Sequence, residues 1–341
     1  MTNNNNKIFV EVISDNAIDY DSDILVLKYA QNLYGLDRAV VDIFEEEGIN
    51  IYEELPKTGK YLIKKSPNKI TPPNLIFIGT QRLKYFGYKE IREFGRIAIT
   101  SLYKSQLPIE HISLTIHGVG YGLDEDEAFS SQLAGIIDAI TSGHFPKKLH
   151  KITFIERSSK RSSVLKRLLS SLLPNYYIDT NPDTINEEDS SKKILREVGY
   201  TSENKPHVFV AMPFKEEMED VWDYGIQPPV KSAGYICERA DLSSFTGDVM
   251  DWVRKRIKTA QIVIADLTGS NPNVYLEVGF AWGVGVPTIL LMNNGSDLKF
   301  DVQGQRCLKY NRIKELEKLL EKELTKLAKK EELTRGIGDR D

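Results

Sequence analysis

Short apolar runs alternate with helical patterns through most of the chain, and this alternation restricts the fold more than any other feature. In the N-terminal half, the apolar runs that predict strands lie at 8–13, 24–27, 75–78, 112–116 and 152–155. The patterns that predict helices lie at 35–47, 88–105, 125–142 and 162–173. Regular alternation of this kind is typical of a mostly parallel sheet with helices on both faces. The sequence therefore predicts an α/β fold.

A polar stretch at 175–205 interrupts the pattern, and the same alternation returns after it. Strands are predicted at 208–212, 235–238, 262–265 and 288–292, and helices at 217–233, 248–259, 273–283 and 313–330. Because 341 residues are long for a single hydrophobic core, we expect two domains of the same α/β class. The expected boundaries are 1–174 for the first domain, 175–205 for a polar linker and 206–335 for the second domain.

Composition and charge narrow the class of protein. The formal net charge is −4, whereas neutralising a phosphate backbone requires a basic surface, so we expect no direct binding to nucleic acid. The N-terminus lacks the pattern of a signal peptide, and no apolar segment is long enough to span a bilayer. The two cysteines, Cys237 and Cys307, lack metal-ligand spacing and suit a reducing compartment. These features predict a cytoplasmic protein without membrane attachment.

Two acidic residues occupy positions at which α/β proteins often have catalytic or ligand-binding residues. Asp266 ends an apolar run, a turn rich in Gly, Asn and Pro follows, and a helix is predicted to begin near Asn273 with Glu277 in its early turns. Ligands of open parallel sheets bind beyond the carboxyl ends of the strands, so we expect both carboxylates to face one crevice. The neighbours of Glu277 in this helix are mostly apolar, and a buried carboxylate is costly unless it has a partner or a function.

Polar and aromatic residues also follow the other predicted strands of this half. Met212, Pro213 and Phe214 come after the first strand, and Arg239 and Asp241 come after the second. Parallel strands would bring these loops to the same edge as Asp266. The simpler alternative is that Asp266 caps its loop, that Arg239 and Asp241 form a surface ion pair, and that the aromatic residues fill the core.

The C-terminal half resembles the nucleoside 2-deoxyribosyltransferase-like family, which belongs to the wider group of TIR-like N-glycosidases. The resemblance covers about 206–324 and rests on motifs in a consistent order: 208–214 (VFVAMPF), 224–226 (YGI) with Pro228, 234–235 (GY), 239–241 (RAD), 265–269 (ADLTG), 271–279 (NPNVYLEVG), 300–301 (FD) and Tyr310. It implies a flavodoxin-like or TIR-like fold. It also implies that Glu277 acts on the anomeric carbon of a ribosyl or deoxyribosyl group and that aspartates hold the sugar or base. The transferases often carry small residues before the glutamate, whereas this chain has Asn271, Pro272 and Asn273, which favours hydrolysis over transfer to a second base.

The residue types suit cleavage of an N-glycosidic bond, and this argument does not depend on the resemblance. Breaking an N-glycosidic bond develops positive charge on the ribose ring, and a carboxylate can stabilise that charge or trap it covalently. We assign this role to Glu277, with Asp266 as the second catalytic candidate, and expect Arg239 to bind a phosphate. No metal or cofactor is expected, because the histidines and cysteines show no ligand spacing. The expected substrate-binding residues are Met212, Pro213, Phe214, Tyr224, Arg239, Asp241, Asn273 and Trp282.

A glycine-rich segment in the N-terminal half follows a predicted strand and precedes a helix. It contains Gly118, Gly120 and Gly122, and backbone N–H groups in such a position can approach a phosphate. A flexible turn is the alternative. With the runs at 23–27 and 75–79, this segment is similar to a macro domain of the leucine aminopeptidase N-terminal type over about 7–174. That resemblance implies a nucleotide-derived signalling ligand bound by Thr80 and the three glycines.

A ligand-sensing domain joined to an N-glycosidase domain is similar in plan to bacterial antiphage effectors. It implies that a bound nucleotide signal activates hydrolysis of NAD+, which is the substrate rather than a cofactor. The alternatives are hydrolysis of (deoxy)nucleosides or nucleotides, and a nucleotide-sensing or scaffolding protein with a catalytically inactive TIR-like domain. The apolar stripe of the last predicted helix, with Leu316, Leu320 and Leu324, either packs on its own domain or supports a homo-oligomer.

Overall fold

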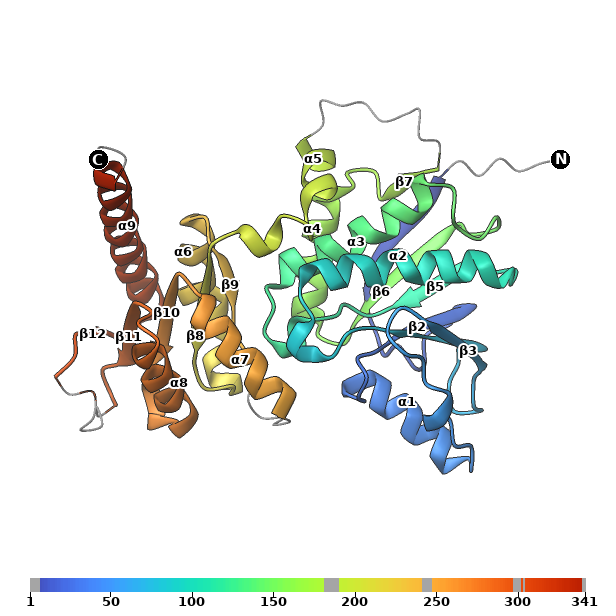
Figure 1. Ribbon diagram of the computed structural model, residues 1–341, viewed down its shortest axis with the longest axis horizontal. Helices are drawn as coiled ribbons and strands as arrows, with labels where there is room; N and C mark the ends of the chain where they lie inside the picture. The colour runs from blue at the N-terminus through green and yellow to red at the C-terminus, as the bar shows by residue number, and fades with distance from the viewer. Residues whose placement is uncertain (1–6, 181–189, 241–246, 297–301, 303, 339–341) are drawn as a thin grey trace. The chain divides into compact units, whose positions relative to one another are not determined.

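The computed structural model describes residues 7–180, 190–240, 247–296, 302 and 304–338 (Figure 1). The chain divides into two compact units. The first contains Met1–Val119 and Glu125–Glu203, and the second contains Gly120–Asp124 and Asn204–Asp341. Each unit has its own sheet, so each is described by itself.

The first unit contains a seven-stranded sheet in the order β3-β4-β2-β5-β6-β1-β7. The inner pairs are parallel, and the edge strands β3 and β7 pair antiparallel with their neighbours. Residues 24–27 of β2 form a continuous apolar run that is buried on both faces, as parallel strands covered by helices usually are. The strands are β1 (Lys7–Ser14), β2 (Ile24–Tyr29), β3 (Tyr61–Lys65), β4 (Asn74–Gly79), β5 (His111–Leu114), β6 (Lys151–Glu156) and β7 (Tyr177–Asp179).

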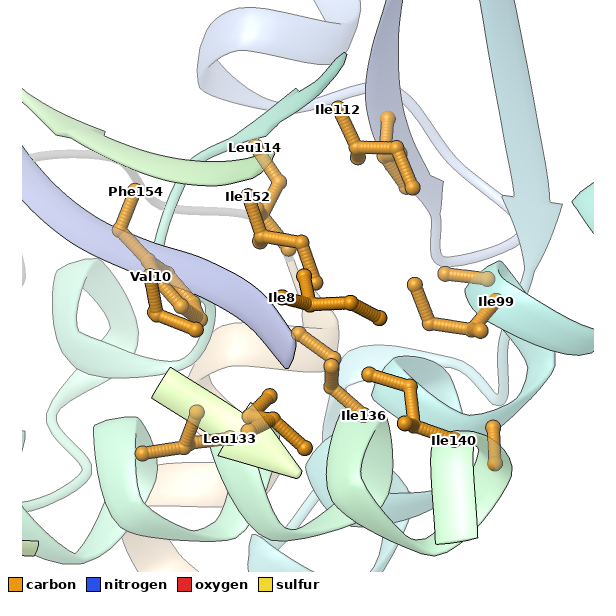
Figure 2. Close-up of a cluster of buried hydrophobic side chains, with 14 of the residues drawn as sticks. Ile8, Val10, Ile99, Ile112, Leu114, Leu133, Ile136, Ile140, Ile152 and Phe154 are labelled. Carbon is orange, nitrogen blue, oxygen red and sulfur yellow. The ribbon is translucent and has the colours of Figure 1, made fainter. Parts of the chain in front are cut away.

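Helices cover both faces of this sheet. One core joins alternate strand residues to α2 (Tyr88–Ser105), α3 (Glu125–Thr141) and α4 (Ser159–Leu172), and a second core joins the other strand residues to α1 (Gly35–Glu46). Figure 2 shows Ile8, Val10 and Ile152 of the strands beside Leu133 and Ile136 of α3. Gly95 and Gly135 let α2 and α3 pack closely, because a Cβ at Gly135 would overlap the carbonyl group of Arg92.

The segment 175–205, for which a polar linker is predicted, contains a strand and a helix. Strand β7 pairs antiparallel with β1, and Ile178 is buried in the first core. Helix α5 (Ser190–Glu197) follows, and Leu195 and Val198 are buried in the same core. A few apolar residues therefore attach this polar stretch to the first unit. Residues 181–189 lie outside the described residues.

The second unit has a five-stranded parallel sheet in the order β9-β8-β10-β11-β12. In chain order this is second, first, third, fourth, fifth, which is the flavodoxin-like order, and the switch point lies between β8 and β10. The predicted fold class, with two mostly parallel sheets flanked by helices, is confirmed. The strands are β8 (His207–Ala211), β9 (Ile236–Glu238), β10 (Ile262–Asp266), β11 (Thr288–Asn293) and β12 (Cys307–Tyr310).

Two groups of helices pack on this sheet. The π-helical segment η7 (Val221–Ile226), α6 (Gln227–Ser232) and α9 (Ile313–Gly338) contact one another, and α7 (Gly247–Thr259) and α8 (Pro272–Gly283) form a second contacting pair. The apolar stripe of α9 packs on its own unit, where Leu316, Leu320 and Leu324 are completely buried. In the described part of the chain, no helix is both long and apolar enough to cross a bilayer.

One predicted helix is broken in the structure. A continuous helix was expected at 217–233, but this stretch forms η6 (Glu216–Met218), then η7 and then α6. Pro228 and Pro229 follow Gln227 in the first turn of α6, and neither can donate a backbone hydrogen bond to the preceding turn. The π-helical turns lie directly before this pair.

Candidate functional site

The switch point of the second sheet is built from the end of β10, a tight turn and the start of α8. Two left-handed residues, Gly269 with φ 72° and Ser270 with φ 52°, reverse the chain after β10. Asn271 then caps α8, since its side chain accepts a hydrogen bond of 2.9 Å from the backbone N–H of Asn273. Pro272 occupies the first helical position, where it suits the backbone. The sequence from 268 to 273 therefore fixes the direction in which α8 leaves the sheet.

Asp266 is completely buried and connects three neighbouring strands. Its carboxylate accepts hydrogen bonds from the hydroxyl of Tyr310 at 2.7 Å and from the backbone N–H of Thr268 at 2.9 Å. The hydroxyl of Thr268 in turn accepts a hydrogen bond of 3.0 Å from the backbone N–H of Asn293. This network joins the ends of β10, β11 and β12. Asp266 therefore stabilises the base of the turn that carries α8.

Replacing Tyr310 by Phe tests this network. The variant keeps the aromatic ring but removes the hydroxyl that donates to the Asp266 carboxylate. Loss of one partner of a buried charged group typically costs about 1–3 kcal/mol, so we expect the free energy of unfolding to fall by this amount in urea denaturation. The control is Tyr224→Phe, at a tyrosine that is 56% exposed, which should change stability by less than about 0.5 kcal/mol. Equal stability of the two variants would contradict the role of the network.

Glu277 lies in α8 among buried apolar residues. It is only 6% exposed, and Val274, Val278 and Ala281 of the same helix are also buried. Within the described residues, no hydrogen bond or ion pair joins the Glu277 carboxyl group to a neighbour. Burial alone raises the pKa of Glu277 to about 8. The free protein therefore holds this carboxyl group mostly protonated at neutral pH.

The raised pKa predicts a pH-dependent contribution to stability. The unfolded chain ionises Glu277 near its ordinary pKa of 4.5, whereas the folded chain keeps the proton until about pH 8. The contribution is therefore fully present below about pH 4.5 and is lost as the pH rises through 8, with a total on the order of 5 kcal/mol. Glu277→Gln cannot ionise and should not show this loss. Urea denaturation of both proteins at pH 5.5 and pH 8.5 measures the difference, and parallel losses in the two proteins would contradict the assignment.

Arg239 follows β9 and is enclosed by aromatic side chains. Its guanidinium carbon lies 4.1 Å from the ring centre of Phe214 and 4.6 Å from that of Trp222. One guanidinium N–H group donates to Glu219 Oε1 at 2.9 Å, and another lies 3.8 Å from the sulfur of Met212. The structure thus brings together three residues of the predicted binding set, Met212, Phe214 and Arg239. It adds Glu219 and Trp222, which the sequence did not single out.

The other predicted binding residues are more dispersed. Trp282 is partly exposed and follows Glu277 by five residues, which turns it roughly 140° away around the helix. Tyr224 lies in η7 and is exposed, Pro213 follows β8, and Asn273 lies in the first turn of α8. Asp241 lies outside the described residues, as do Phe300 and Asp301.

A buried ion pair that the sequence analysis missed lies beside Arg239. Glu238 of β9 is completely buried and receives two hydrogen bonds from the guanidinium group of Arg256 in α7, at 2.6 and 2.7 Å. His207 Nε2 donates to the carbonyl oxygen of Arg256 at 3.0 Å, and burial lowers the pKa of His207. A glutamate that ends an otherwise apolar strand was the signal that could have revealed this pair. It attaches α7 to the strand that precedes Arg239.

The expected signal-binding residues are divided between the two units. Thr80 and Gly118 belong to the first unit, whereas Gly120 and Gly122 belong to the second. Thr80 is buried, and its backbone N–H donates to the carbonyl oxygen of Tyr29 at 2.8 Å. Gly118 and Gly122 have positive φ angles of 95° and 104°, and the carbonyl oxygen of Gly122 accepts a hydrogen bond from the backbone N–H of Arg239.

A group of buried polar residues in the first unit was also missed: Lys28 of β2, Asp37 of α1 and His117, which follows β5. Lys28, Asp37 and His117 are each less than 10% exposed. Burial raises the pKa of Asp37 to about 7, although Lys28 opposes that shift, and burial lowers the pKa of His117 well below its ordinary value. Among the described residues, no group of three or more His, Cys, Asp or Glu side chains is arranged to hold a metal ion.

Comparisons with known proteins give similarity to solved structures alone. No protein-family model and no curated protein matches the sequence. A macrodomain of Oceanobacillus iheyensis with MES bound is 18% identical, with a TM-score of 0.38, over 51% of this chain and 97% of that chain. A variant of that macrodomain with ADPR is 17% identical, with a TM-score of 0.38, over 51% and 99% of the two chains. The Clostridium botulinum CMP N-glycosidase BcmB is 24% identical, with a TM-score of 0.28, over 33% and 97%. At these values the matches assign no function to this chain.

Proposed function

We propose that the second unit is an N-glycosidase in which the Glu277 carboxylate acts on the anomeric carbon of a ribosyl group. The observation that supports this most is a nearly buried carboxyl group in α8, the helix that follows β10 at the switch point of a parallel sheet, with no partner among the described residues. An ionisable group without a partner is costly to bury, and carboxyl groups with strongly perturbed pKa values cluster at functional sites. In its ionised form, Glu277 stabilises the positive charge that develops on the ribose ring.

Asp266 has a positioning role in this proposal. It is completely buried and already accepts hydrogen bonds from Tyr310 and Thr268. Contact with a sugar hydroxyl would require these bonds to rearrange. We therefore assign Asp266 to holding the turn from which α8 presents Glu277, rather than to contact with the substrate.

NAD+ is the substrate that we propose first, because its nicotinamide is a good leaving group. The bond between C1′ and the pyridinium nitrogen breaks, and its electron pair stays with the nitrogen. Water adds a hydroxyl group to C1′ and releases one proton, which gives nicotinamide and ADP-ribose. The alternative substrates are (deoxy)nucleosides and nucleotides, from which a purine or pyrimidine base would leave.

We also propose that a nucleotide signal bound by the first unit activates the second, with a role in bacterial antiphage defence. The first unit offers Thr80 and Gly118 beyond the ends of β4 and β5, at the edge of a parallel sheet where ligands usually bind. The alternative is a sensing or scaffolding protein whose second unit has no catalytic activity.

The pKa of Glu277 predicts how activity depends on pH. A carboxylate that stabilises positive charge must be ionised, and the free protein ionises this group near pH 8. We expect kcat/KM for NAD+ to rise about tenfold per pH unit below pH 8 and to level off above it. Initial rates between pH 5.5 and 9.5 measure this profile. A rate that falls above pH 8 would instead indicate that Glu277 acts as a general acid.

Base release tests the proposed function. The full-length protein is incubated with NAD+ and with a panel of nucleosides and nucleotides, each with and without cyclic nucleotides, and the products are separated by chromatography. Nicotinamide release that increases with one cyclic nucleotide supports both the activity and its regulation. Release of a different base supports the alternative substrate class. Absence of base release from every mixture favours the scaffolding protein.

A further inference from the structure

The Arg239 and Glu219 pair is asymmetric in its exposure. The Arg239 side chain is 9% exposed and is fixed between Phe214 and Trp222, whereas the Glu219 side chain is 41% exposed. A buried guanidinium group needs a negative partner, because leaving it unpaired is costly. A partly exposed carboxylate, by contrast, can return to water at little cost. The arginine is therefore the fixed member of the pair, and the carboxylate is the exchangeable member.

The guanidinium group of Arg239 can bind a phosphate in the same way as it binds the Glu219 carboxylate. Two aromatic rings lie close to the guanidinium group and restrict its orientation. Guanidinium groups bind carboxylates and phosphates through the same N–H groups. Glu219 Oε1 accepts from one of these groups at 2.9 Å. A phosphate oxygen can accept from that group in the same way once the carboxylate moves away.

The segment that holds Glu219 and Trp222 has an unusual backbone. Glu219 follows η6, and Trp222 lies in the π-helical η7. π-Helical turns are rare and occur frequently at functional sites. A regular α-helix was expected here, and its different turn would place Trp222 elsewhere relative to Arg239.

Arg239 and Asp266 lie at the same end of the sheet, where the parallel strands have their carboxyl ends. Arg239 follows β9, and Asp266 ends β10, with β8 between them in a parallel sheet. Two inter-strand spacings separate these ends by about 10 Å. A ribose phosphate and the long arginine side chain together can cover this distance, with the ribose near α8 and the phosphate near Arg239.

We propose that the Glu219 carboxylate pairs with Arg239 in the free protein and that a phosphate group of the substrate takes its place, so that the site selects nucleotides over nucleosides. This inference rests on the proposed N-glycosidase function and makes Arg239 and Glu219 its specificity-determining residues. Glu219 competes with the phosphate and lowers the affinity for every phosphorylated substrate. A nucleoside gains nothing from the exchange.

Nicotinamide mononucleotide and nicotinamide riboside form a matched pair of probes, because they differ only in the phosphate group. The measured quantity is the ratio of their kcat/KM values. Arg239→Gln should lower this ratio by about 10- to 100-fold, as expected for one charged hydrogen-bonded contact. Glu219→Gln should raise the ratio about fivefold or more through a lower KM for the mononucleotide. Glu217→Gln is the control, since that side chain is 74% exposed and pairs with Lys215, and it should leave the ratio unchanged.

A binding measurement separates failure of this inference from failure of the proposed function. Calorimetry with AMP and with adenosine, using the Glu277→Gln protein, requires no turnover. Tighter binding of AMP in the Glu219→Gln background, weaker binding in the Arg239→Gln background and no change for adenosine support the exchange even if no base is released. Equal effects of Glu219→Gln on AMP and adenosine, or no effect on either, would overturn it. Circular dichroism of each variant verifies that it is folded.

Discussion

Glu277→Gln is expected to reduce kcat for base release from NAD+ by about a thousandfold or more. The substitution preserves the size of the side chain and removes the negative charge that stabilises the oxocarbenium-like transition state. Loss of a single group that acts only in the transition state commonly costs two to four orders of magnitude in rate. KM should change little, because the neutral glutamine resembles the protonated glutamate that predominates in the free protein at neutral pH.

The control for Glu277→Gln is the same change at an exposed glutamate of the same unit. Glu217→Gln alters one carboxylate at the surface and should retain the wild-type rate. Thermal unfolding of both variants verifies that the second unit remains folded. A Glu277→Gln protein that is folded and still releases base at the wild-type rate would exclude Glu277 from the chemistry.

Arg256→Met is expected to lower the free energy of unfolding of the second unit by about 3–5 kcal/mol, the typical cost of removing one partner of a buried ion pair. Glu238 is completely buried and receives two hydrogen bonds from Arg256. Methionine fills much of the space of the arginine stem but supplies no donor. The carboxylate of Glu238 is then left in an apolar environment, and the attachment of α7 to β9 weakens.

Arg254→Met on the same helix is the matched control. Arg254 is 56% exposed and pairs with the equally exposed Asp251, whereas the Arg256 side chain is 16% exposed. Exposed pairs contribute about 0–1 kcal/mol, so urea denaturation of the control should show little change. Similar losses of unfolding free energy in the two variants would indicate that any arginine-to-methionine change in α7 destabilises the unit, and that the buried pair has no special role.

The periodic parts of the sequence predicted the fold class well. Continuous apolar runs identified β2, β8 and β10, because strands buried on both faces admit few polar residues. The turn rich in Gly, Asn and Pro predicted a helix that begins near Asn273, and α8 begins one residue earlier, where Asn271 caps the helix and Pro272 suits its first turn. The short edge strands β3, β7 and β12 were missed, because each is short and carries polar residues.

The partners of the candidate site could not be predicted in the same way. The hydrogen bond between Tyr310 and Asp266 joins residues that are 44 positions apart in the sequence, and the one between Arg239 and Glu219 joins residues that are 20 positions apart. Neither contact follows from periodicity, because both depend on which strands and turns become neighbours. The sequence correctly placed Asp266 at a strand end and Glu277 in the following helix. Only the structure showed that Tyr310 and Thr268 donate hydrogen bonds to the Asp266 carboxylate. For Glu277, the described residues provide no hydrogen-bond partner.

The most direct test of the central proposal is the product balance for NAD+ with the wild-type protein and with Glu277→Gln. Chromatography of the reaction, run with the cyclic nucleotide that activates most strongly, measures nicotinamide and ADP-ribose separately. The proposed mechanism predicts equal amounts of both products from the wild-type protein and almost none from the variant. Absence of nicotinamide from the wild-type reaction under every condition, or equal release by the folded variant, would contradict it.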